Sequence, residues 1–217
     1  MVRVSAADVS DTGCQEQHDV PVPPTETAPA QGTRARVERA ALDLFSRRGF
    51  ENVTTDEVAD AAGISRRTFF RYYATKADAV WGDFAGHVAR LEELLAATDP
   101  ARPVLTSVCA AYVEANDYAD AELPLLRERM QLILGEPALL AHSQVRHAEI
   151  DQVVARHVAT RTGGSPTALV PRLVAATTRA AATTAFEVWL ADPRSSLAWH
   201  LHLAFDEITA GFPGLRH

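Results

Sequence analysis

The chain has 217 residues, of which 47% are hydrophobic, which is enough for a substantial core in one large domain or two small ones. It contains no run of about 18 apolar residues, so we expect no membrane-spanning helix. The N-terminus lacks the apolar core of a signal peptide, so we expect a cytoplasmic location. The two cysteines, Cys14 and Cys109, lie far apart and do not suggest a disulfide framework or a zinc site.

The net charge of −7 argues at first against a nucleic-acid partner, but its distribution along the chain changes that conclusion. Residues 33–76 carry nine basic and six acidic side chains, whereas residues 1–32 and 77–217 are both acidic overall. A short basic module within an acidic protein suits local contact with phosphate groups. Residues 1–32 also include four prolines between positions 21 and 32 and show no hydrophobic period, which predicts a disordered tail.

The first four predicted helices follow from periodicity and capping signals. An apolar stripe begins after Thr33 and ends at Gly49, as expected where a helix stops. The segment 54–57 reads Thr-Thr-Asp-Glu, a capping box that begins a short second helix ending at Gly63. Ser65 can cap a third helix, and the cap at residues 75–78 is expected to begin a long fourth helix that runs to about residue 97.

The remainder of the chain repeats this helical pattern, with prolines near first turns and glycine or Asp-Pro pairs between segments. It predicts five more helices, over residues 101–118, 122–134, 137–161, 169–191 and 195–211. Strand-like alternation never extends beyond a few residues, so the predicted fold class is all-α.

The second and third predicted helices are joined by Gly63-Ile64-Ser65, which is the pattern of a helix-turn-helix. The third helix opens with Arg66 and Arg67. Two cations at the electropositive end of a helix cost about 0.3–1 kcal/mol each, a cost that bound phosphates or guanine edges would offset. The alternative is an ordinary solvated basic face beside core aromatics.

These residues resemble the DNA-binding domain of the tetracycline-repressor (TetR) family, over residues 45–50 and 54–76. Members of that family are helical homodimers that bind palindromic operators. The resemblance implies a helix-turn-helix domain over residues 33–78 and an effector-binding and dimerisation domain over residues 79–217. Together with the chemistry of the third helix, it implies DNA contacts at Thr55, Ser65, Arg66, Arg67, Thr68, Phe70, Tyr72 and Lys76.

A narrower resemblance extends into the second domain. Residues 76–84, 127–134 and 141–143 are similar to the mycofactocin-system branch of the family. Regulators of that branch are associated with a redox-cofactor biosynthesis cluster and respond to long-chain acyl-CoA thioesters. The resemblance therefore implies a small hydrophobic effector of this kind.

Large apolar residues and cations on different predicted helices could form the effector site. The candidates are Phe84, Arg127, Met130, Leu134, His142, Arg146, Phe186 and Trp189. The alternatives are that the apolar members fill a core and that the charged members are surface ions. The histidines are not spaced as pairs on one helix face, so we expect no metal site, and we expect no cofactor.

Residues 175–185 are almost all small, which would let two helices approach closely in a dimeric four-helix bundle. The resulting hypothesis is a homodimeric repressor that a ligand releases from DNA by changing the spacing of its two reading helices. A DNA-binding activator or scaffold without an effector is a second hypothesis. A helical enzyme is a third, which the lack of a convergent acid–base set disfavours.

Overall fold

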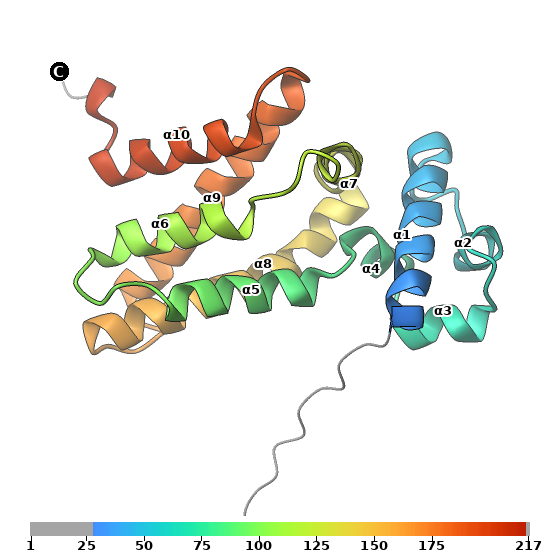
Figure 1. Cartoon of the computed structure of the whole chain (residues 1–217), viewed down its shortest axis with the longest axis horizontal. Coiled ribbons are helices and arrows are strands. Elements are labelled where there is room, and N and C mark those ends of the chain that lie inside the picture. Colours follow the sequence, from blue (N-terminus) through green and yellow to red (C-terminus); the bar gives the residue numbers. More distant parts are fainter. Residues whose placement is uncertain (1–27, 216–217) are drawn as a thin grey trace, which may run out of the picture.

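The computed structural model describes residues 28–215, and in this range it is entirely helical with no β-strand (Figure 1). The N-terminal helices are α1 (Ala28–Arg48), α2 (Thr55–Ala61), α3 (Arg66–Tyr72), α4 (Lys76–Trp81) and α5 (Phe84–Ala96). They are followed by α6 (Val104–Ala115), α7 (Leu123–Gly135), α8 (Pro137–Thr162), α9 (Leu169–Ala191), α10 (Leu197–Ala210) and the short 3₁₀ helix η1 (Pro213–Leu215). The all-α prediction is therefore confirmed. Within this range no helix is both long and apolar enough to cross a bilayer.

Helices α1 to α3 form a small N-terminal module at one end of the molecule (Figure 1). Its core is built around Phe45, Val58 and Phe69, each no more than 1% exposed. Helix α1 begins at Ala28 rather than near Thr33, so the predicted tail is five residues too long at its C-terminal end. The other residues of that predicted tail, 1–27, lie outside the described range.

The predicted long fourth helix is wrong, because the chain breaks between α4 and α5. Gly82 ends α4 with φ +62°, a conformation that favours glycine over residues with a Cβ. Asp83 then begins α5 by accepting a hydrogen bond from the backbone N–H of Gly86 at 3.0 Å. The break lies where the N-terminal module meets the rest of the protein, so it sets the direction in which α5 leaves.

Helices α5 to α10 form the larger C-terminal body, in which α8 and α9 pack along each other and α10 packs on α9. Figure 1 shows α9 and α10 on the other side of α7 from the N-terminal module. The core of this body includes Leu91, Val154 and Leu201, each fully buried. Trp81, Met130 and Leu134 pack against both this core and that of the N-terminal module, so the two cores meet at α4 and α7.

Candidate DNA interface and ligand cavity

Local hydrogen bonds fix both ends of the turn between α2 and α3. Thr54 accepts from the backbone N–H of Glu57, and Glu57 accepts from the backbone N–H of Thr54 at 2.8 Å, which completes the predicted capping box. Gly63 ends α2 with φ +67°. The side chain of Ser65 then accepts from the backbone N–H of Thr68 at 3.1 Å and begins α3.

Helix α3 buries one face in the N-terminal module and presents the other to solvent. Phe69 is fully buried, whereas Phe70 is 44% exposed. Arg66, Arg67 and Arg71 are all exposed, and the Arg71 guanidinium lies 4.9 Å from the centre of the Tyr72 ring. An exposed basic helix face of this kind can contact phosphates and base edges in a major groove.

The two leading arginines differ in their surroundings. Arg66 forms an ion pair with Asp56 of α2 at 2.7 Å, and its guanidinium lies 5.4 Å from the centre of the Phe70 ring. Within residues 28–215, Arg67 has no carboxylate within ion-pair distance, so its guanidinium remains available to a ligand. Arg66 must break its ion pair with Asp56 before it can bind a new partner.

The remaining predicted DNA contacts lie near this face, with one exception. Thr55 is the first residue of α2, and the hydroxyls of Ser65 and Thr68 lie 2.9 Å apart at the start of α3. Tyr72 is half-buried and accepts a hydrogen bond from Arg71. Lys76 departs from the expectation, because its ammonium donates to the backbone carbonyls of Phe50 and Val53, at 2.8 and 3.0 Å.

The location of Lys76 has a physical reason. Its ammonium also lies 4.3 Å from the centre of the Phe50 ring, so cation–π attraction adds to the two hydrogen bonds. Two of its three donors serve the loop between α1 and α2, which leaves one for a phosphate. The structure therefore gives Lys76 a role in holding that loop.

The capping box of α2 makes stability depend on pH. Hydrogen bonds from the backbone of Thr54 and from Arg48 hold the pKa of Glu57 at about 2, below its ordinary value of 4.5. A lowered pKa contributes stability that is fully present above pH 4.5 and is lost as the pH falls toward about 2.

We expect Glu57→Gln to have a lower free energy of unfolding than the wild type near neutral pH. Urea unfolding should show that this difference in free energy shrinks as the pH falls from 4.5 toward about 2. A difference independent of pH would contradict the prediction.

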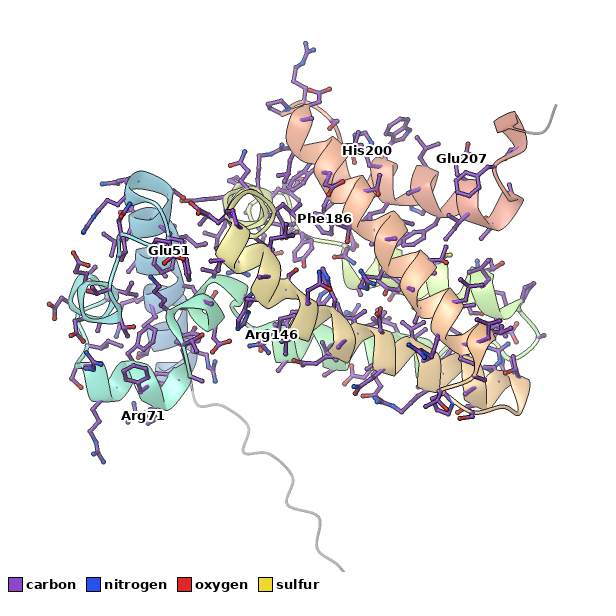
Figure 2. All side chains as sticks on the ribbon, turned by 180° about the vertical axis from the view of Figure 1, so that it is seen from behind. Glu51, Arg71, Arg146, Phe186, His200 and Glu207 are labelled. Carbon is purple, nitrogen blue, oxygen red and sulfur yellow. The ribbon has the colours of Figure 1, made fainter. Side chains whose placement is uncertain are left out.

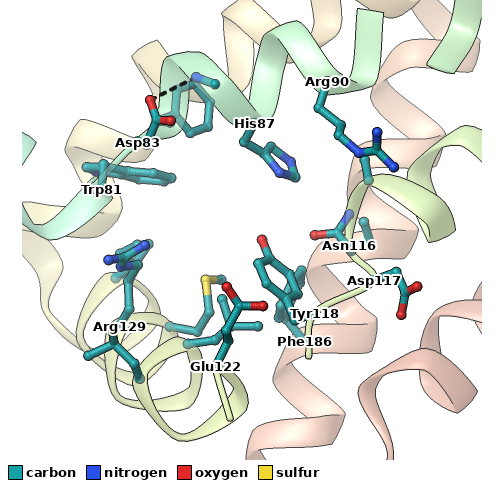
Figure 3. Close-up of a pocket in the computed structure, with 18 of the residues that line it drawn as sticks. Trp81, Asp83, His87, Arg90, Asn116, Asp117, Tyr118, Glu122, Arg129 and Phe186 are labelled. Carbon is teal, nitrogen blue, oxygen red and sulfur yellow. Dashed lines mark hydrogen bonds between the residues drawn. The ribbon is translucent and has the colours of Figure 1, made fainter. Parts of the chain in front are cut away.

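A cavity of about 880 Å³ opens within the C-terminal body, between α5, α6, α7 and α9 (Figure 3). Glu38 and Arg39 of α1 also reach its wall. Its apolar lining consists of Trp81, Phe84, Leu125, Leu126, Met130, Ile133, Leu134, Ile150 and Phe186, together with small residues. A cavity of this volume lies in the range that holds a small organic molecule.

Four of the eight predicted ligand-binding residues line this cavity: Phe84, Met130, Leu134 and Phe186. Trp189 does not, because it is 2% exposed and packs in the core. Arg127 does not, because its guanidinium lies 4.0 Å from the centre of the Trp189 ring and donates to the Trp189 carbonyl at 2.9 Å. It serves the end of α9, where backbone carbonyls lack helical partners.

His142 and Arg146 are not part of the cavity lining either, although the Arg146 guanidinium lies 5.3 Å from the centre of the Phe84 ring on the outer side of the wall. Arg146 donates to Asp78 of α4 at 2.7 Å and to Glu149 at 3.2 Å, and the Nε2 atom of His142 is 3.5 Å from Asp78. Figure 2 places Arg146 on α8 where it faces the N-terminal half of the chain. These side chains therefore fasten α8 to α4, and the structure does not bring them into the cavity lining with the other predicted ligand-binding residues.

The sequence did not identify the polar side chains that do line the cavity. Buried atoms without a hydrogen-bond partner in the described part of the chain include Trp81 Nε1, Tyr112 Oη, Arg129 Nε and His147 Nδ1. Burial lowers the pKa of His87 and of His147, which favours the neutral form of both rings. The sequence offered one signal for these residues, which is a polar side chain within an apolar helical stripe, as at Tyr112 in α6.

A helix-turn-helix with an exposed basic face, joined to a larger helical body that contains a cavity, defines a transcriptional regulator of the helix-turn-helix class. The chain belongs to the TetR family. Residues 39–79 match the family model described as "Bacterial regulatory proteins, tetR family", and residues 102–213 match the model described as "MftR C-terminal domain".

Named relatives agree with this assignment. A Mycobacterium tuberculosis protein whose name, MftR, assigns it to transcriptional regulation of mycofactocin biosynthesis is 40% identical over 84% of this chain and 92% of its own. The regulator TcmR of Streptomyces glaucescens is 32% identical over 60% of this chain and 61% of its own. The resemblance to the mycofactocin-system branch is thus confirmed.

Solved structures share the fold at lower identity. A TetR-family regulator from Syntrophomonas wolfei superposes with a TM-score of 0.61 at 14% identity, over 85% of this chain and 96% of that chain. FadR of Thermus thermophilus, solved in complex with lauroyl-CoA, gives a TM-score of 0.51 at 24% identity, also over 85% of this chain and 96% of that chain.

Proposed function

We propose that this protein is a homodimeric repressor that binds a palindromic operator through α3 and leaves it when a hydrophobic effector occupies the 880 Å³ cavity. The observation that carries this proposal is the position of the cavity. Its wall includes Glu38 of α1, in the N-terminal module, and Trp81 of α4, which packs against the core of that module, so the N-terminal module takes part in the effector site. A ligand that favours one arrangement of these residues therefore changes the arrangement of α3.

A long-chain acyl-CoA thioester is our first candidate effector. The apolar lining contributed by α5, α7 and α9 suits an acyl chain. The lauroyl-CoA complex of Thermus thermophilus FadR supports the same class of ligand for a protein of this fold. An activator without an effector remains the competing hypothesis, and it predicts operator binding that no ligand changes.

We expect an acyl-CoA thioester to raise the melting temperature of the protein and to weaken operator binding by about 5–150-fold, because coupling energies between sites are typically of that size. Thermal shift and gel-shift titrations with the same ligand measure the two effects. The free thiol CoA is the control for the nucleotide part. Met130→Trp, which narrows the cavity, should lose both effects. A ligand that binds without changing operator affinity would contradict release.

The dimer interface proposed here is the outer face of α9 and α10. Exposed residues on α9 follow a helical stripe that includes Leu173, Ala180 and Val188, and α10 continues it with Trp199 and Leu203. Large apolar residues with 43–58% exposure on adjacent helices suit burial against a second copy. Figure 1 shows both helices on the other side of α7 from α1, α2 and α3.

Ala180→Arg is expected to convert the dimer to a monomer, because it places an unpaired charge in the middle of this stripe. Sedimentation-velocity measurements report the mass, with Ala101→Arg, at an exposed loop position, as the matched control. Operator affinity should decrease as the dimeric fraction decreases. An Ala180→Arg protein that remains dimeric would exclude this face as the interface.

A further inference from the structure

An ion pair connects the cavity to α3. Arg129 of α7 donates through Nη2 to Oε2 of Glu38 in α1 at 2.8 Å, and the side chains are only 19% and 14% exposed. Through Oε1, Glu38 also accepts a hydrogen bond from the Tyr73 hydroxyl at 3.1 Å. Tyr73 is the C-cap residue that directly follows α3. One carboxylate therefore connects a cation of the cavity wall to the C-terminal end of the reading helix.

The break between α4 and α5 lies directly against this ion pair. A Cβ atom at Gly82 would lie 2.8 Å from both terminal nitrogens of Arg129 and from Oε2 of Glu38. Gly82 also has a positive φ, so both the backbone conformation and the lack of space for a side chain favour glycine at this position. The ion pair therefore lies immediately beside this break, with no space for a side chain between them.

The same end of the cavity has hydrogen-bond donors that lack an acceptor. Arg129 Nε and Trp81 Nε1 are buried without a partner in residues 28–215, and both groups can only donate. Figure 3 shows the two side chains at one end of the cavity. Buried donors are normally satisfied, so an acceptor that enters this end of the cavity would gain two hydrogen bonds that the protein leaves unmade.

We propose that this end of the cavity binds an anionic oxygen group of the effector, a carboxylate or a phosphate, and that this group competes with Glu38 for Arg129. A planar guanidinium binds two oxygens through neighbouring nitrogens. The edge formed by Nε and Nη2 contains both the unpartnered nitrogen and the nitrogen that Glu38 holds. Binding of the anion draws Arg129 from Glu38, and Tyr73 then loses its fixed acceptor at the end of α3. The competition deepens the proposed function, on which it rests.

The binding experiment uses isothermal titration calorimetry of the full chain with decanoate, decyl phosphate and the neutral 1-decanol. Arg129→Gln should weaken binding of the preferred anion about tenfold or more and leave 1-decanol unchanged. Arg156→Gln, which removes an exposed arginine paired with Glu92, is the matched control and should bind like the wild type. Comparison of decanoate with decyl phosphate identifies the preferred head group. Equal wild-type affinity for 1-decanol and both anions, or an Arg129→Gln protein that keeps wild-type anion affinity, would overturn the anion site.

Two further variants separate competition from a merely structural role. Glu38→Gln keeps an acceptor for Tyr73 but frees Arg129, so it should bind the preferred anion about threefold more tightly. Tyr73→Phe leaves the cavity unchanged, so it should keep anion affinity while the ligand-induced fall in operator affinity shrinks about threefold or more. Weaker anion binding by Glu38→Gln would overturn the competition. If Tyr73→Phe responds to acyl-CoA like the wild type, the link between Arg129 and α3 is excluded, but the proposed function is not.

If the wild type binds the anion without any change in operator affinity, both that link and the proposed function are excluded, whereas the anion site is retained.

Discussion

Phe69→Ala is expected to lower the free energy of unfolding by about 3–5 kcal/mol, because the ring is fully buried and its removal leaves a cavity. Phe69 is the residue that α3 buries in the N-terminal core, where its ring centre lies 5.6 Å from that of Tyr73. Without it, α3 loses its anchor and operator binding should fail at the temperature where the wild type binds. Urea unfolding measures the stability change.

The adjacent Phe70 is the matched control. It is 44% exposed, so Phe70→Ala should change the free energy of unfolding by less than about 1 kcal/mol. Its ring nevertheless lies on the solvent face of α3 beside Arg66, so operator affinity should fall although the protein remains folded. Equal losses of stability in the two variants would contradict the orientation of α3 described here.

Arg67→Ala is expected to weaken operator binding by about 1–3 kcal/mol, or about 5–150-fold, and to relax sequence choice at one base pair. Arg67 is exposed and has no ion-pair partner in residues 28–215, so its removal leaves no unpaired carboxylate in the protein. Stability and dimer mass should therefore remain unchanged. Gel-shift titrations against the operator and single-base variants measure both affinity and specificity.

Arg66→Ala should also weaken and relax binding, but by a smaller amount, because Arg66 must first leave Asp56. Asp56→Asn should consequently strengthen operator binding, since it removes both that competition and a negative charge facing DNA. Arg156→Ala, on the exposed surface of α8, serves as the control for general loss of positive charge. An Arg67→Ala protein with unchanged affinity and specificity would remove Arg67 from the reading surface.

The helix-turn-helix was predictable because short-range hydrogen bonds determine its boundaries. The pairing of Thr54 with Glu57 and the cap at Ser65 join groups three residues apart, so the sequence contains all the participants. The break at Gly82 was not predictable by this route. A single glycine is tolerated inside a helix, and here its conformation is associated with the Arg129–Glu38 pair, whose members lie 91 residues apart.

The candidate ligand site was predicted only in part, for a related reason. Phe186 and Trp189 are both large apolar residues on α9, yet Phe186 faces the cavity and Trp189 packs in the core beneath Arg127. Hydrophobic periodicity indicates which face of a helix is buried. It cannot distinguish a side chain that packs in the core from one that borders a cavity. Likewise, Asp78, the shorter of the two acidic contacts of Arg146, is 68 residues away in α4.

The amino-acid sequence alone determined the all-helical class, the reading helix with its basic face and the family resemblance, because these depend on neighbours within a few turns of the chain. Only the tertiary structure decided which side chains enclose the cavity, which cations are already paired and where α4 gives way to α5. Each of these outcomes depends on contacts between helices far apart in sequence, and the energy of such contacts exists only once the helices have packed.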